Sequence, residues 1–233
     1  MKIAALLQLN SSLLLKIYNH RFNLSLHKGE LSQAIFKSFL KQDELYLKAY
    51  TKALKEVSRR LTKETHIKHF NRFIESTLAL EQDIQFNYLK KFTTVSFFAE
   101  KQKPVRKLPV ITKYSQHLLD TSVNASLEEA VISLLPCFII YQELGLRMDL
   151  SNCTPEHPYR EWIETYSSEE FRISTSNFIQ IADELNQGLN CPYHLNKIQL
   201  SFKQSIEFEY RFFEEIFSLN NEIVQDSICF NRA

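Results

Sequence analysis

The sequence predicts an all-α fold, and three observations carry that prediction. Apolar residues recur at helical spacing through most of the 233-residue chain, and N-terminal capping patterns separate the periodic stretches. Gly and Pro are rare, at three and six residues, which leaves little room for long loops. Alternation typical of a strand is confined to short stretches, of which 93–99 comes nearest, and we interpret it as a helix end or loop. We therefore expect a single domain, residues 1–233, forming a bundle of seven to eight helices.

The first half of the chain is expected to contain four helices. Leu and Ile recur at helical spacing over residues 1–20, which predicts the first helix. Ser32 is a good N-cap for a long second helix, whose apolar residues fall seven apart on one narrow face. A third long helix is expected over 63–92. The prolines and basic residues of 101–110 predict a loop, and a short helix should follow over 112–119.

Two capping patterns open the next helices. Ser126 has Glu129 three residues after it, which forms a capping box for a helix that should run through Met148. Thr154 is followed by Pro155, a residue that suits the first position of a helix, so a further helix is expected to begin there.

The last two expected helices follow the same logic. A second capping box at 167–170 opens a helix that should end near Gly188, because Gly commonly terminates helices. Apolar periodicity predicts a final helix over 196–219.

Composition excludes several classes of function. Hydrophobic residues make up 44% and charged residues 24%, an ordinary balance for a globular protein. The formal net charge of +1 creates no strong field for nucleic acid or an anionic membrane. The apolar N-terminus lacks a run of about 18 apolar residues, so we do not expect a membrane span. The four cysteines show no zinc-site spacing, and free thiols in a reducing compartment are the simplest interpretation. We expect a cytoplasmic protein without nucleic-acid or membrane partners.

Three residues do not fit the apolar faces on which they lie. Asp43 falls among the apolar residues of the second helix, and Glu209 falls among those of the last. Cys137 lies in the apolar stretch LLPCFIIYQELG, where a small apolar residue would fill the same space equally well. A buried carboxylate is costly unless it is bonded or paired. Each acid could merely bond a tyrosine, arginine or amide and fix helix register. Alternatively, both acids face one pocket with Cys137, as a nucleophile with an acid–base pair.

Four stretches, in this order, resemble the TenA family of thiaminase II enzymes: KQDELYL, LLPCFIIYQELG, HPYREWIETYSSEEF and FEYRFF. The segment HRFNLSLHKGELSQAIFKSFLKQD is similar to that family's opening, and the resemblance covers roughly residues 15 to 220. It implies a helical bundle of heme-oxygenase type, assembled as a homotetramer. It also implies hydrolysis at the carbon that joins an aminopyrimidine ring to its leaving group. Aminomethyl-aminopyrimidine or thiamin would then yield hydroxymethylpyrimidine for thiamin salvage.

The resemblance also implies roles for particular residues. Cys137 matches the family's nucleophile, Glu209 its catalytic acid–base group and Asp43 its substrate-binding aspartate. The implied substrate-binding aromatic residues are Tyr46, Tyr114, Tyr141, Tyr166 and Phe212. No metal or organic cofactor is implied.

Two alternatives stay open at this stage. The bundle could bind pyrimidines or a protein partner without catalysis. It could also be a metal-dependent oxidase, although the Glu-x-x-His motifs of a di-iron bundle are absent from the sequence. The chain departs from the family's pattern at Arg21, within its opening motif, and at Phe213, where the family often has Trp. These departures bear on substrate fit more than on the reacting groups.

Overall fold

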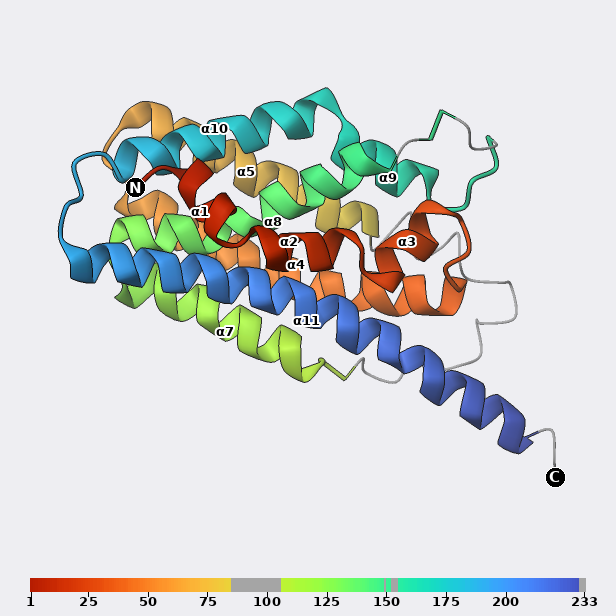
Figure 1. Cartoon of the computed structure of the whole chain (residues 1–233). Coiled ribbons are helices and arrows are strands. Elements are labelled where there is room, and N and C mark those ends of the chain that lie inside the picture. Colours follow the sequence, from red (N-terminus) through yellow and green to blue (C-terminus); the bar gives the residue numbers. More distant parts are fainter. Residues whose placement is uncertain (85–105, 149, 152–154, 231–233) are drawn as a thin grey trace.

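A computed structural model describes residues 1–84, 106–148, 150–151 and 155–230, with side chains described up to residue 219. Within these residues the regular structure is entirely α-helical, apart from a short π turn at Ile84, and Figure 1 shows the helices as one bundle. The ten helices are α1 (Ile3–Leu9), α2 (Ser11–Tyr18), α3 (Arg21–His27), α4 (Gln33–Arg60), α5 (Glu64–Asp83), α7 (Pro109–Asn124), α8 (Leu127–Arg147), α9 (Arg160–Ser167), α10 (Glu169–Leu185) and α11 (Pro192–Phe230). The predicted all-α bundle is confirmed. The 93–99 stretch and the predicted end of the third helix at 92 lie outside the described residues.

The centre of the bundle is α8. It packs against α2, α4, α7, α9, α10 and α11. In the described part of the chain it is also the one helix long and apolar enough to cross a membrane, with a mean hydropathy of 1.4. Because 72% of that stretch is buried against other helices, its apolar character is that of a core helix.

The N-terminal segment forms three short helices where the sequence predicted one. Asn10 ends α1, and its side-chain amide donates to the Leu6 carbonyl at 2.8 Å. His20 precedes α3, and its Nδ1 accepts from the Phe22 backbone amide at 3.1 Å. Side chains of this kind compete with the helical backbone for hydrogen bonds, so helices tend to break where they occur. The helix count therefore exceeds the expected seven to eight.

Other predicted boundaries agree with the structure to different degrees. Ser126 caps α8 by accepting from the Glu129 amide at 3.2 Å, as predicted. Ser32 is the N-cap of α4, but its side chain makes no capping hydrogen bond. Ser168, one residue later than the start of the expected box, caps α10 by accepting from the Phe171 amide. The predicted helices over 112–119 and 196–219 extend further at both ends, as α7 and α11.

The predicted helix start at Thr154 and Pro155 is wrong. Thr154 lies outside the described residues, Pro155 is in a turn, and α9 begins only at Arg160. Pro158 explains the delay, because a proline disfavours helical conformation in the residue before it. That residue, His157, instead accepts from the Tyr159 amide through Nδ1 at 3.3 Å and contacts the His27 carbonyl through Nε2.

Candidate functional site

The turn of α8 that carries Cys137 is held from outside the helix. Pro136 has no backbone N–H, so it removes one hydrogen bond from the ladder at this point. Two hydroxyls bind neighbouring carbonyls: Ser205 donates to the Ser133 oxygen at 2.7 Å, and Tyr50 donates to the Leu134 oxygen at 2.8 Å. The thiol is therefore presented by an interrupted turn that α4 and α11 anchor. Cys137 is partly buried and lines a cavity.

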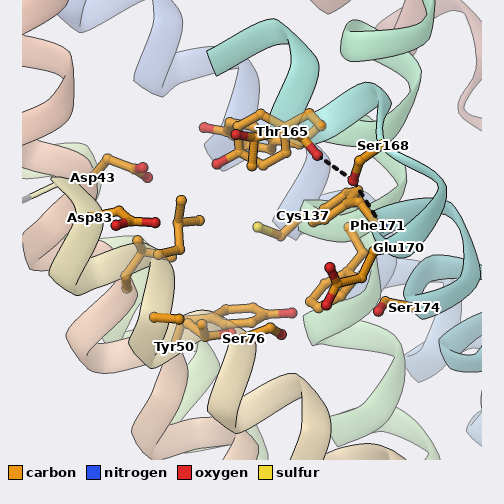
Figure 2. Close-up of a pocket in the computed structure, with 17 residues that line it drawn as sticks. Asp43, Tyr50, Ser76, Asp83, Cys137, Thr165, Ser168, Glu170, Phe171 and Ser174 are labelled. Atoms are coloured by element: carbon orange, nitrogen blue, oxygen red, sulfur yellow. Dashed lines mark hydrogen bonds between the residues drawn. The ribbon is translucent and has the colours of Figure 1, made fainter. Parts of the chain in front are cut away.

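The cavity has a volume of about 270 Å³ and lies between α4, α5, α8, α9 and α10. That volume is slightly below the range typical of pockets for drug-sized ligands, so a single small ring suits it. Figure 2 shows the Cys137 sulfur between the carboxylates of Asp43 and Asp83 on one side and Glu170 on the other. Tyr141 and Tyr166 also line the cavity, with ring centroids 4.9 Å apart.

Asp43 is an unpartnered acid at this cavity. Its side chain is only 2% exposed, yet its Oδ2 has no hydrogen-bond partner among the described residues. Burial raises the pKa of Asp43 to about 7. An unsatisfied buried acceptor is costly, and one that lines a cavity can be satisfied by a ligand bound there. The carboxyl group therefore stands ready to accept hydrogen bonds from a ligand.

Glu209 lies one layer behind the cavity wall, on α11. It is 1% exposed and accepts a hydrogen bond from the Tyr114 hydroxyl at 3.0 Å. Burial raises the pKa of Glu209 to about 8; the Tyr114 hydrogen bond opposes this rise and the negative charge of Asp43 adds to it. Two buried acids with pKa values near neutrality can exchange protons during a reaction.

The thiol of Cys137 is strongly biased towards its protonated form. Burial raises the pKa of Cys137 well above its usual value, and the charge of Glu209 raises it further. The Tyr46 hydroxyl acts in the opposite direction, because it can donate to a thiolate. The Tyr46 hydroxyl is buried and has no hydrogen-bond partner among the described residues. Attack by the sulfur therefore needs simultaneous removal of its proton, and the neighbouring carboxylates are suitable acceptors.

The structure brings most of the predicted site residues to one region. Asp43, Cys137, Tyr141 and Tyr166 line the cavity directly. Glu209, Tyr46 and Tyr114 form the layer behind it, where the rings of Tyr46 and Tyr114 pack with centroids 4.9 Å apart. Phe212 does not line the cavity. Its ring stacks on Phe39, with centroids 5.2 Å apart.

Part of the cavity wall was not predicted. α5 supplies Ser76, Thr77 and Asp83, and α10 supplies Glu170 and Ser174. Small polar and acidic residues at these positions read from the sequence as a solvated helix face. Their proximity to the cysteine follows only from the packing of α5 and α10 around α8. No group of three or more His, Cys, Asp or Glu able to hold a metal ion occurs in the described part of the chain.

The fold and this site define a class of protein: a helical bundle that encloses a small cavity with a thiol and buried acids. A family model described as the TENA/THI-4/PQQC family matches residues 10–217, and the chain belongs to this family.

Curated relatives and solved structures agree with that membership. Aminopyrimidine aminohydrolase of Halalkalibacterium halodurans is 29% identical over 74% of this chain and 76% of its own length. The enzyme of the same name from Bacillus subtilis is 26% identical over 83% of this chain and 80% of its own. A TenA homologue from Pyrococcus furiosus superposes with a TM-score of 0.81 at 16% identity, covering 93% of this chain and all of that one. The superposition supports the fold alone.

Proposed function

We propose that the chain is an aminopyrimidine aminohydrolase of thiamin salvage, which releases hydroxymethylpyrimidine with Cys137 as nucleophile. The observation that carries this proposal is the approach of one thiol and one unpartnered buried carboxyl to the same small cavity, with a second buried acid behind it. The relatives named aminopyrimidine aminohydrolase, similar over most of the chain, support the reaction.

The chemistry begins with addition to the ring. The exocyclic carbon of an aminopyrimidine resists direct displacement because the ring is electron-rich. The sulfur of Cys137 bonds to a ring carbon, the ring takes up the electron pair, and the thiol proton passes to a carboxylate. Loss of the leaving group with its bonding electrons then generates an exocyclic double bond: an amino group leaves as ammonia after it takes a proton from the acid, and the thiazolium of thiamin leaves as neutral thiazole without one. Water then adds to the exocyclic carbon and gives up a proton to a carboxylate, and the sulfur leaves the ring as a thiolate with the C–S bonding pair, so the ring regains its aromatic character.

The two acids have different roles in this scheme. Glu209, held by Tyr114, supplies the proton to the ring or leaving group and later activates the water. Asp43 accepts hydrogen bonds from the amino group or protonated nitrogen of the ring and fixes its orientation. Tyr141 and Tyr166 form the aromatic wall of the cavity and exclude bulk water from it.

The test is a product assay with aminomethyl-aminopyrimidine and thiamin in parallel, with hydroxymethylpyrimidine measured by chromatography. Turnover of at least one substrate is expected. Tight binding of hydroxymethylpyrimidine with no turnover of either substrate would contradict the proposal and favour a binding protein. Metal analysis of the active preparation addresses the oxidase alternative, because activity should not follow metal content.

The assembly and location are part of the proposal. We propose a homotetramer in the cytoplasm, as the family resemblance implies. Sedimentation analysis of the purified chain checks this, and a monomer at all concentrations would contradict it.

A further inference from the structure

Ser205 on α11 makes a hydrogen bond to α8 that has no role of its own in the proposed reaction. Its hydroxyl donates to the Ser133 backbone carbonyl at 2.7 Å, and the two residues are 72 positions apart in the sequence. Both are fully buried, with 0% of each residue exposed to solvent. Neither of the two lines the cavity, so this hydrogen bond can affect a bound ligand only through the helices that it joins.

The two ends of the Ser205–Ser133 hydrogen bond lie one helical turn before the two groups that the reaction needs. Cys137 follows Ser133 by four residues on α8, and Glu209 follows Ser205 by four residues on α11. Residues four apart in an α-helix lie on the same face, about 6 Å apart along the axis. The hydrogen bond therefore joins α8 to α11 beside both the proposed nucleophile and the proposed acid.

This hydrogen bond also lies where the backbone of α8 is interrupted. Pro136 has no N–H to donate to the Ile132 carbonyl, and a proline ring crowds that carbonyl and opens the helix locally. The next acceptor along the chain is the Ser133 carbonyl, which accepts the Cys137 amide in a regular helix. Ser205 gives this carbonyl a donor from another helix. Because the donor is fully buried, bulk water cannot replace it.

His117 on α7 favours this direction of the Ser205 hydroxyl. The helices α7, α8 and α11 pack against one another (Figure 1). The His117 Nε2 lies 3.2 Å from the Ser205 Oγ, farther than the Ser133 oxygen at 2.7 Å. A hydroxyl has one hydrogen, and here it points to the nearer acceptor, so the Oγ accepts from the ring. Burial lowers the pKa of His117 to about 4, so the ring has a single proton at neutral pH, and this contact places it on Nε2.

We propose that Ser205 is a positioning residue for the reaction, whose hydroxyl holds the turn of α8 before Cys137 against the turn of α11 before Glu209. This inference rests on the proposed function. Without the hydroxyl, the interrupted turn of α8 loses its donor from α11, and the spacing between thiol and acid is no longer fixed. The substrate ring keeps its contacts with Asp43 on α4 and Tyr166 on α9, so its binding should change little.

The kinetic experiment compares Ser205→Ala with Ser201→Ala. Ser201 lies one turn earlier on α11 and is 3% exposed, and its Oγ has no hydrogen-bond partner among the described residues. The two substitutions thus remove the same group from the same buried face, but only one removes the hydrogen bond to α8. Ser205→Ala should lower kcat and kcat/KM for hydroxymethylpyrimidine release equally, by about 10- to 100-fold, with KM unchanged. Ser201→Ala should keep the unmodified values.

Hydrogen exchange tests the same hydrogen bond without any reaction. Loss of the Ser205 donor should let α8 open more often at Pro136. The backbone amides of Cys137 and Phe138 should therefore exchange faster in Ser205→Ala than in the unmodified chain, relative to amides elsewhere in the core. Ser201→Ala should leave these two rates unchanged. Equal exchange in all three proteins would contradict the proposed anchoring of the turn.

Nitrogen NMR of His117 tests the direction of the hydrogen bond. The ring should carry its proton on Nε2 near neutral pH. A proton on Nδ1 would make Nε2 the acceptor of the Ser205 hydroxyl, which would take the donor away from the Ser133 carbonyl and overturn the inference.

Two kinetic results would also overturn the inference. One is an unchanged kcat in a folded Ser205→Ala protein, and the other is a rise in KM that accounts for the whole loss in kcat/KM. Absence of turnover by the unmodified chain would instead contradict the proposed function. The exchange rates and the His117 spectrum would then still decide whether Ser205 holds the turn before Cys137.

Discussion

At the scale of single residues, the site is defined by acids kept away from water. Burial holds the pKa of Asp43 near 7 and that of Glu209 near 8, so both acids can carry or release a proton at neutral pH. Cys137 lies among them with its own pKa raised, which makes its thiolate dependent on proton transfer to a neighbour. The three groups are therefore expected to act together in one proton transfer sequence.

Replacement of Glu209 by Gln tests its role as the acid. The substitution keeps the shape of the side chain but removes the proton, and kcat should fall by about 10² to 10⁴. In the unmodified chain kcat/KM should decline above about pH 8, where Glu209 loses its proton. The measurement is a pH profile of both proteins. A variant that keeps the unmodified rate and the same decline would assign the acid to another group.

Gly145 is a residue on which the position of Tyr166 depends. A Cβ at Gly145 would lie 2.6 Å from the Ser167 backbone nitrogen and 2.6 Å from the Tyr166 carbonyl carbon, so α9 can approach α8 only because this residue is Gly. Gly145→Ala should displace the end of α9 and raise KM, because Tyr166 lines the cavity. The free energy of unfolding should fall by about 1–3 kcal/mol, as is usual for overpacking.

Gly188→Ala provides the control for this prediction. Gly188 has a φ of +85° with no atom within 4 Å of a new Cβ, so the substitution strains the backbone without crowding the site. Its unfolding free energy should fall by about 1 kcal/mol while KM stays unchanged. Denaturant titration and steady-state kinetics measure both effects, and an unchanged KM for Gly145→Ala would contradict the positioning role.

At the scale of elements, α8 belongs both to the hydrophobic core and to the candidate active site. Its apolar faces pack against six neighbouring helices, and the same helix carries Cys137, Tyr141 and Gly145. Periodicity could identify Asp43 and Glu209 as acids on buried faces, because a charge among apolar residues at helical spacing is visible in a sequence. Pro158, which disfavours helical conformation in the residue before it, can also be read from the sequence. The Thr154–Pro155 pattern is typical of a helix start, however, and it led to a predicted start that is too early.

Other parts of the site could not be predicted from periodicity. Ser76, Thr77 and Ser174 look like surface residues of α5 and α10, and only the packing of these helices around α8 makes them cavity residues. Likewise, the hydroxyls of Tyr50 and Ser205 bind α8 carbonyls across more than 70 residues of sequence. Contacts between distant elements depend on helix crossing geometry, which the local pattern of one helix does not specify.

At the scale of the whole molecule, the buried acids couple stability to pH. Asp and Glu titrate near pH 4 in an unfolded chain, whereas Asp43 and Glu209 titrate near 7 and 8 when folded. Between these values the folded protein binds more protons than the unfolded chain, so these two groups make the free energy of unfolding fall as pH rises from about 4 to about 8. The site is thus maintained at a cost in stability.

The double variant Asp43→Asn/Glu209→Gln should remove the contribution of these two acids to the fall in the free energy of unfolding with rising pH. Relative to the unmodified chain, its free energy of unfolding should be similar near pH 4 and higher by a few kcal/mol near pH 8, at roughly 1.4 kcal/mol per pKa unit. The difference between the two proteins is the useful quantity, because His117, whose pKa burial lowers to about 4, contributes in the opposite direction in both. Urea titrations across this pH range measure it, and a constant difference would contradict the raised pKa values.

The most direct test of the whole account is the rate at which Cys137→Ala releases hydroxymethylpyrimidine from aminomethyl-aminopyrimidine. Cys191→Ala is the matched control, since Cys191 is an exposed free cysteine that does not line the cavity. The account predicts that Cys137→Ala loses at least about a thousandfold in kcat while Cys191→Ala keeps the unmodified rate. A folded Cys137→Ala protein that releases product within tenfold of the unmodified rate would contradict the assignment of Cys137 as the nucleophile.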